Sequence, residues 1–139
     1  MKNSRILVLT VALFLLTAKM GHAQVDTKAA EQAAGNWLAL VDSGKYPDAY
    51  KGFAQFFTDR MPLDKWEPQV KSARDIFGKF VARKLKSATP ATSLPGAPDG
   101  QYVVLLYDTT FEKKQNAVET VTVSLDKNQK WGVVGYYIK

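Results

Sequence analysis

The stretch QYVVLLYDTTFEKKQNAVETVTVSLDKNQKWGVVGYYI (residues 101–138) decides the fold. It contains three runs in which β-branched and aromatic residues alternate with other residues, a pattern typical of β-strands. The segments 112–116 and 126–130 separate the runs and have the length of hairpin loops. The sequence therefore predicts an antiparallel meander in the C-terminal part of the chain.

The alternation also predicts which strand residues face each other. If Lys114 is the centre of the first loop, Tyr107 lies opposite Val121, and if Asn128 is the centre of the second, Glu119 lies opposite Tyr137. A slip of one residue would scatter the apolar set over both faces, so the register is well specified. The face expected to carry the helices contains Val103, Leu105, Tyr107, Val121, Val123, Leu125, Trp131, Val133 and Tyr137.

Glu119 is a charged residue on a mostly apolar face, where it lies between Thr109 and Tyr137 and near Tyr107. A carboxylate there must be hydrogen-bonded, paired or placed at a solvated rim. Glu119 is either a polar anchor, acid or base in a pocket between sheet and helices, or it lies beyond the helices and meets water or a lysine. The candidate pocket residues are Glu119, Tyr107, Thr109, Tyr137 and Trp131.

The opposite face of the predicted sheet is more apolar than a face in water requires. Either a chain terminus or a second subunit is expected to cover it, and we favour a homodimer through this face. The residues expected at the dimer contact are Tyr102, Val104, Leu106, Val134, Tyr136 and Ile138.

A further strand is expected within residues 82–94, at the edge of the sheet. Pro90 cannot donate to a ladder, and Lys84 and Lys86 point to the outer face, as in strands that resist pairing. The run GAPDG (96–100) that follows is a turn rather than a phosphate loop, because it has no Gly-Lys-Ser/Thr end and opens no helix.

Three amphipathic segments precede the strands, over residues 27–43, 47–58 and 62–80. Pro68 lies inside the third, so a kink or break is expected near Trp66–Glu67. Helices followed by an antiparallel meander predict an α+β fold, with two or three helices packed on a four-stranded sheet.

The first residues, MKNSRILVLTVALFLLTAKMGHAQ, have the pattern of a cleaved secretory signal. Cleavage after Ala23 would leave residues 24–139 as a single exported domain, periplasmic or secreted, with no transmembrane segment. The formal net charge would fall from +6 to +3, and the only histidine, His22, would be lost.

The resulting domain has neither His nor Cys. It therefore lacks thiol nucleophiles, Cys/His zinc sites and Ser-His-Asp triads, and we expect neither a metal site nor a cofactor. A basic stretch contains Lys71, Arg74, Lys79, Arg83, Lys84 and Lys86. We interpret it mostly as a solvated helix face, with contact to anionic lipid or polysaccharide as the alternative. The mild charge and the absence of interleaved aromatics argue against nucleic-acid binding.

The segments SLPGAPDG (93–100), YDTTFEKK (107–114), AVETVT (117–122) and GYYIK (135–139) resemble the family known as domain of unknown function 4019. The segment WLALVDSGKYPDAY (37–50) is also similar to the opening of nuclear-transport-factor-2-like and cystatin-like folds. The resemblance implies a small exported bacterial protein with helices in the concave side of a curved sheet. It brings no catalytic residues, and Pro90 puts the continuity of the first strand in doubt.

Three functions remain open from the sequence. The first is a non-catalytic module of the cell envelope that binds a ligand or a partner. The second is a lyase- or isomerase-type enzyme that uses Glu119 with Tyr107 or Tyr137. The third is a structural or interaction domain that dimerises through its sheet.

Overall fold

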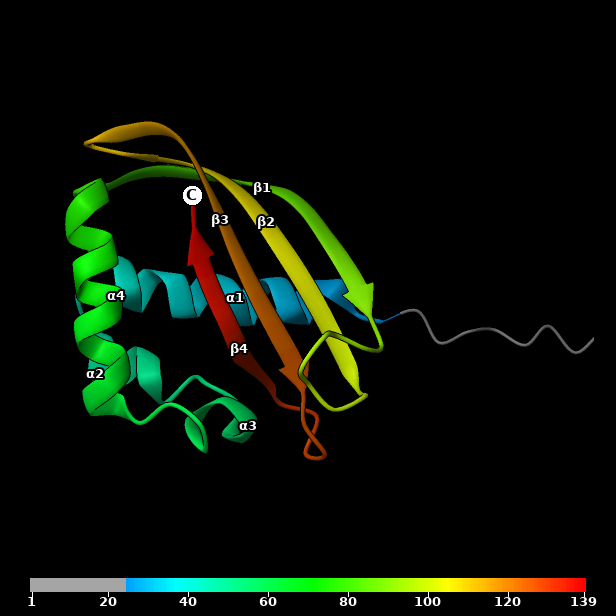
Figure 1. Ribbon diagram of the computed structural model, residues 1–139. Helices are drawn as coiled ribbons and strands as arrows, with labels where there is room; N and C mark the ends of the chain where they lie inside the picture. Colours follow the sequence, from blue (N-terminus) through cyan, green and yellow to red (C-terminus); the bar gives the residue numbers. More distant parts are fainter. Residues whose placement is uncertain (1–24) are drawn as a thin grey trace, which may run out of the picture.

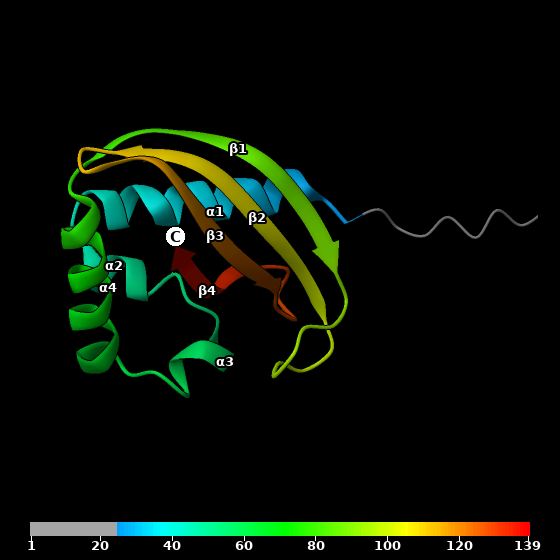
Figure 2. The same ribbon diagram turned by 45° about the horizontal axis from the view of Figure 1, so that its top comes forward.

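The antiparallel sheet curves around the longest helix of the described part of the chain (Figure 2). The computed structural model describes residues 25–139, and the predicted signal peptide lies outside this range. The helices are α1 (Thr27–Asp42), α2 (Tyr46–Tyr50), α3 (Gln55–Thr58) and α4 (Leu63–Phe77). The strands are β1 (Phe80–Ala91), β2 (Gln101–Phe111), β3 (Lys114–Leu125) and β4 (Trp131–Ile138). The strand order is β1-β2-β3-β4 with every pair antiparallel, which confirms the predicted α+β fold and meander.

Helix α1 occupies the concave side of the sheet and contacts all four strands (Figures 1 and 2). Asp26 caps its start through a hydrogen bond from the backbone N–H of Lys28. Helix α4 runs across the far end of α1, near the start of β1 (Figure 1). The buried face of α1 consists of Ala30, Ala34, Trp37, Leu38 and Val41.

The predicted helix over residues 47–58 is wrong, because it is divided into α2 and α3. Between them, residues 52–54 leave the helical path and pair with the edge of β4. The Ala54 N–H donates to the Val133 carbonyl at 2.8 Å, and the Val133 N–H donates to the Gly52 carbonyl at 2.9 Å. This parallel bridge satisfies backbone groups at the edge of β4, which explains why the helix is interrupted.

Of the kink or break expected near Pro68, the break is wrong, because α4 is helical from Leu63 to Phe77. Pro68 is exposed and removes one helical hydrogen bond, while Trp66 and Val70 bury their side chains on the other side of the helix. Tertiary packing therefore outweighs the local cost of proline.

The predicted pairing of β2 with β3 is wrong by two residues. Tyr107 lies opposite Glu119, and Val121 lies opposite Leu105. The strands extend into the expected loop until only Glu112 and Lys113 form the turn. A shift of two residues leaves each side chain on its predicted face.

A β-bulge changes the faces of β4. Val123 pairs with Val133, but Thr122 pairs with Gly135, so Val134 is an extra residue. The residues after Val134 therefore lie on the opposite face of the sheet from the one predicted. Tyr136 lies opposite Val121, on the helix side, whereas Tyr137 is 58% exposed. The predicted positions of Tyr137 on the inner face and of Tyr136 and Ile138 on the outer face are wrong for this reason.

Part of the outer face is covered by the chain itself. Tyr102 is buried, and its hydroxyl donates to the carbonyl of Pro98 in the loop before β2. Of the residues expected at a dimer contact, Val104, Leu106 and Val134 remain partly exposed there. The homodimer stays a prediction. Strand β1 is an edge strand as predicted, continues through Pro90, and exposes Lys84 and Lys86.

Candidate functional site

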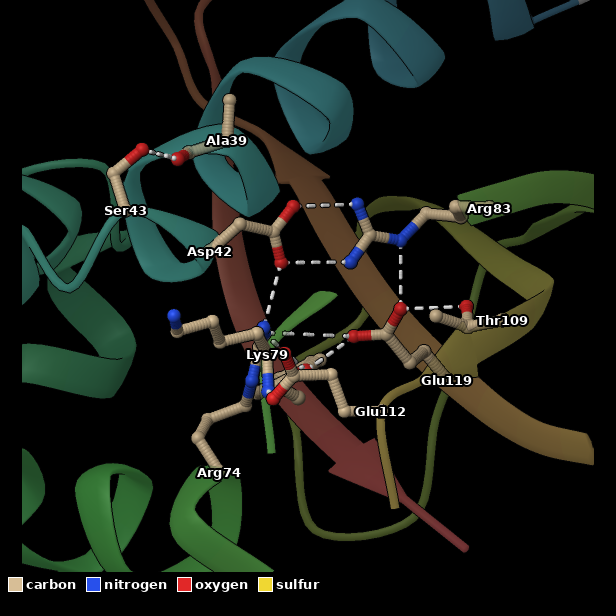
Figure 3. Close-up of polar contacts among 10 residues, drawn as sticks. Ala39, Asp42, Ser43, Arg74, Lys79, Arg83, Thr109, Glu112 and Glu119 are labelled. Carbon is tan, nitrogen blue, oxygen red and sulfur yellow. Dashed lines mark hydrogen bonds and ion pairs between the residues drawn. The ribbon is translucent and has the colours of Figure 1, made fainter. Parts of the chain in front are cut away.

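Glu119 is the centre of a buried network to which six elements each contribute one side chain (Figure 3). In chain order, the members are Asp42 at the end of α1, Arg74 on α4, Arg83 on β1, Thr109 on β2, Glu119 on β3 and Tyr136 on β4. The network joins the concave face of the sheet to two helices.

Both carboxylate oxygens of Glu119 accept hydrogen bonds. Oε1 accepts from Arg83 Nε at 2.6 Å and from Thr109 Oγ1 at 2.7 Å. Oε2 accepts from the Tyr136 hydroxyl. The Glu119 side chain has no exposed surface, so its charge is compensated entirely from within the protein.

Asp42 connects the two arginines. Arg83 donates to both of its oxygens, from Nη1 to Oδ2 at 2.8 Å and from Nη2 to Oδ1 at 3.0 Å. Arg74 Nη2 donates to Oδ1 at 2.8 Å. Two guanidinium groups thus meet two carboxylates, and the bidentate pair fixes the orientation of Arg83. Replacement by lysine would not reproduce this geometry.

Aromatic rings surround the arginines. The Arg74 Cζ lies 4.8 Å from the ring centre of Phe111, and the Arg83 Cζ lies 4.4 Å from that of Phe80. These distances suit cation–π attraction. Arg74 Nε is buried and has no hydrogen-bond partner among the described residues.

The surroundings change the ionisation of several members. Burial disfavours charged Arg83, but the hydrogen bonds and charges of Asp42 and Glu119 outweigh it and raise its pKa. Burial, with the negative charge of Glu119, raises the pKa of Tyr136 well above the ordinary phenol value. Burial also raises the pKa of Tyr107 to about 12. Tyr107 and Tyr136 therefore remain protonated near neutral pH.

This arrangement suits a structural role better than acid–base catalysis. A catalytic base must reach the proton that it removes, but Glu119 is enclosed and both of its carboxylate oxygens already accept hydrogen bonds. The raised tyrosine pKa values favour the neutral phenols, which are poor bases.

The five predicted pocket residues are not gathered at one place. Thr109 donates a hydrogen bond to Glu119, and the ring centre of Tyr107 lies 6.0 Å from Arg83 Cζ. Tyr137 is largely exposed, on the other face of the sheet. Trp131 lies opposite Leu125, at the other end of the β3–β4 pair, where it lines a separate hollow with Val25.

Four network members were not predicted as site residues: Asp42, Arg74, Arg83 and Tyr136. The interpretation of Arg74 and Arg83 as solvated is wrong, since their side chains are only 6% and 12% exposed. The sequence did carry a signal for Arg74, which lies four residues after Val70 in the apolar stripe of α4. The partners of Arg83, by contrast, are 41 and 36 residues away.

A polar pocket of about 470 Å³ adjoins the network. It lies between the ends of α1 and α4 and the β2–β3 hairpin, and Asp42 and Arg74 belong to both pocket and network. Its other charged lining residues are Asp75, Lys79, Glu112 and Lys113.

The acidic groups of this pocket all have partners. Asp42 is held by both arginines, Asp75 pairs with Lys71 at 2.9 Å, and Glu112 accepts the backbone N–H of Lys79 at 3.1 Å. The lysines have spare donors. Lys113 Nζ donates to the Asp75 carbonyl, and the Lys79 ammonium has no hydrogen bond or ion pair within residues 25–139.

Two further properties concern residues 25–139 as a whole. No group of three or more His, Cys, Asp or Glu side chains there is arranged to hold a metal ion. None of the helices in the same range combines the length and the apolar character required to cross a bilayer.

Comparison with known proteins identifies the family but no characterised relative. No curated protein and no solved structure matches the chain, so the likeness to nuclear-transport-factor-2-like and cystatin-like folds stays a prediction. The model of the family described as "Protein of unknown function (DUF4019)" matches residues 33–136, a span that includes every member of the network. The chain therefore belongs to the DUF4019 family.

Proposed function

We propose that this protein is a non-catalytic binding module of the cell envelope, which takes a small anionic ligand in the pocket beside the Asp42–Arg74 pair. One observation carries the proposal: the acids that line the pocket are partnered, whereas Lys79 and Lys113 have spare hydrogen-bond donors. A carboxylate or phosphate group would accept hydrogen bonds from these ammonium groups.

The buried network supports this function by fixing the floor of the pocket. Asp42 and Arg74 are 11% and 6% exposed and are held by partners on other elements. A binding site gains affinity when its groups are already oriented before the ligand arrives. The Glu119 side chain has no exposed surface, and this favours a binding function over the lyase or isomerase alternative.

An NMR titration tests the proposal, with inorganic phosphate, glycerol phosphate and succinate as probes. Saturable shifts are expected for the amides of Gly44, Gly78, Lys79 and Lys113, which belong to the pocket. The double variant Lys79→Ala/Lys113→Ala should weaken binding about tenfold or more, a loss that corresponds to roughly 1.4 kcal/mol.

The matched control is Lys65→Ala, an exposed lysine near the start of α4, whereas the pocket lies at its end. Equal weakening by this control would indicate unspecific charge attraction. Shifts that stay linear with all three probes, or that spread over all lysines, would contradict an anion site in this pocket.

Export is a separate part of the proposal and rests on the N-terminal sequence pattern. Expression in a bacterium should yield a periplasmic or secreted protein with the mass of residues 24–139. An exported protein that retains Met1 would contradict cleavage after Ala23.

A further inference from the structure

Two exposed aliphatic residues lie at one corner of the molecule. The large hydrophobic residues exposed within residues 25–139 are Ile76, Val81 and Tyr137, at 72%, 57% and 58%. Ile76 is near the end of α4 and Val81 near the start of β1, on either side of Gly78. The tip of the β2–β3 hairpin lies at this same corner (Figure 1).

Backbone contacts tie the hairpin to the connection between α4 and β1. The Glu112 N–H donates to the Lys79 carbonyl at 2.9 Å, and the Lys113 N–H donates to the Phe77 carbonyl at 3.0 Å. Lys113 Nζ donates to the Asp75 carbonyl at 3.2 Å. Residues 75–81 and 112–114 are therefore neighbours in space, and this region is here called the basic corner.

Positive charge exceeds negative charge at the basic corner. Lys79, Lys113 and Lys114 are exposed there, and the Lys114 ammonium lies 5.9 Å from the ring centre of Phe77. The acidic residues of the corner are Asp75, which already pairs with Lys71, and Glu112. Exposed aliphatic groups beside lysines suit the boundary between anionic headgroups and acyl chains.

We propose that the basic corner docks on the surface of an anionic phospholipid bilayer. Ile76 and Val81 enter the headgroup region, and Lys79, Lys113 and Lys114 meet the lipid phosphates. The composition favours lipid over a protein partner, because the cores of protein interfaces are depleted of lysine and enriched in aromatic residues. Docking goes beyond the proposed function and does not require a soluble ligand in the pocket.

Co-sedimentation with vesicles tests this proposal. The protein should sediment with vesicles of equal parts phosphatidylglycerol and phosphatidylcholine, and much less with phosphatidylcholine alone. The double variant Ile76→Gln/Val81→Thr should lower the partition coefficient about fivefold or more, since it removes exposed apolar surface. Lys113→Gln/Lys114→Gln should have a similar effect, and added salt should weaken binding.

Matched controls are Tyr137→Ser, the exposed hydrophobic residue on β4, and Lys65→Gln on the exposed surface of α4. Both should bind vesicles as the wild type does, and thermal unfolding should confirm that every variant is folded. The proposal would be overturned if the wild type did not sediment with anionic vesicles, or if the corner variants bound them as strongly as the wild type.

Dextran sulfate separates lipid docking from general attraction to polyanions. Binding to this polymer as tight as that to vesicles, and unaffected by Ile76→Gln/Val81→Thr, would also overturn the proposal. Because the phosphate titration of the pocket needs no vesicles, failure of either proposal can be recognised without the other.

Discussion

Tyr136 donates its hydroxyl hydrogen to Glu119 across the β3–β4 pair, whereas the adjacent Tyr137 is largely exposed. The bulge at Val134 produces this difference, because it places Tyr136 on the concave side of the sheet. An irregularity of one residue thus selects which tyrosine completes the buried network.

Replacement of each tyrosine by phenylalanine should separate their roles. Tyr136→Phe leaves one oxygen of buried Glu119 without this donor, and we expect a loss of about 1–3 kcal/mol in the free energy of unfolding. Tyr137→Phe is the matched control and should change it by less than about 0.5 kcal/mol. Urea denaturation measures both. Equal effects of the two variants would contradict the placement of Tyr136.

The sequence predicted the faces of β3 because apolar and polar residues alternate clearly along this strand. Residues 102–107 of β2 are apolar on both faces, so its faces followed from the expected pairing with β3. An error of two residues in their pairing did not exchange these faces, since the strand period is two. In β4, residues 133–138 place apolar side chains on both faces, so the alternation carried no sign of the bulge. That is why Tyr137 was predicted where Tyr136 lies.

The candidate site was predicted only in part for a related reason. Glu119 is a charged residue on a mostly apolar face, and this local mismatch identified it as a candidate site residue. Thr109 is a diagonal neighbour of Glu119 on the adjacent strand and donates a hydrogen bond to it, but Asp42, Arg74 and Arg83 come from other elements. Which charges meet Glu119 depends on how helices pack on the curved sheet, and no local pattern encodes that arrangement.

Loss of the Glu119 charge should strongly destabilise the protein. In Glu119→Gln, Asp42 alone balances the buried arginines, and breaking a buried ion pair typically costs about 3–5 kcal/mol. We expect a loss of about 3 kcal/mol or more in the free energy of unfolding, measured by urea denaturation.

The control is Asp59→Asn, which changes an exposed carboxylate and should remain within about 0.5 kcal/mol of the wild type. A loss below about 1 kcal/mol for Glu119→Gln would show that the network contributes little net stability.

Gly132 permits the close approach of residues 52–54 to β4. A Cβ at this position would lie 2.9 Å from the Ala54 nitrogen and 3.0 Å from its Cα, both backbone atoms. Gly132→Ala should therefore force the bridge apart and cost about 1–3 kcal/mol in the free energy of unfolding.

Gly135→Ala is the control in the same strand. A Cβ at this position would have no atom of another residue within 4 Å apart from its chain neighbours, so the substitution should be neutral or slightly stabilising. Hydrogen exchange of the Ala54 amide would report whether the bridge opens. Protection as strong as in the wild type would contradict this explanation.

Alkaline pH should destabilise the protein through Tyr107. Burial raises its folded-state pKa to about 12, whereas the pKa of an unfolded tyrosine is about 10. Below about pH 10, the phenol is protonated in both states and its contribution to stability is fully present. As the pH rises, the unfolded state releases its proton first, so this contribution is lost between about pH 10 and about pH 12. We expect Tyr107 to account for a loss on the order of 2 kcal/mol.

The measurement compares the wild type with Tyr107→Phe in urea denaturation from about pH 8 to about pH 12, at constant ionic strength. The difference between their free energies of unfolding should be constant below about pH 9 and should then shift in favour of the variant. Lysine ionisation affects both proteins alike and cancels in this difference. Curves that remain parallel throughout would contradict a raised pKa of Tyr107, because the folded and unfolded states would then release its proton at the same pH.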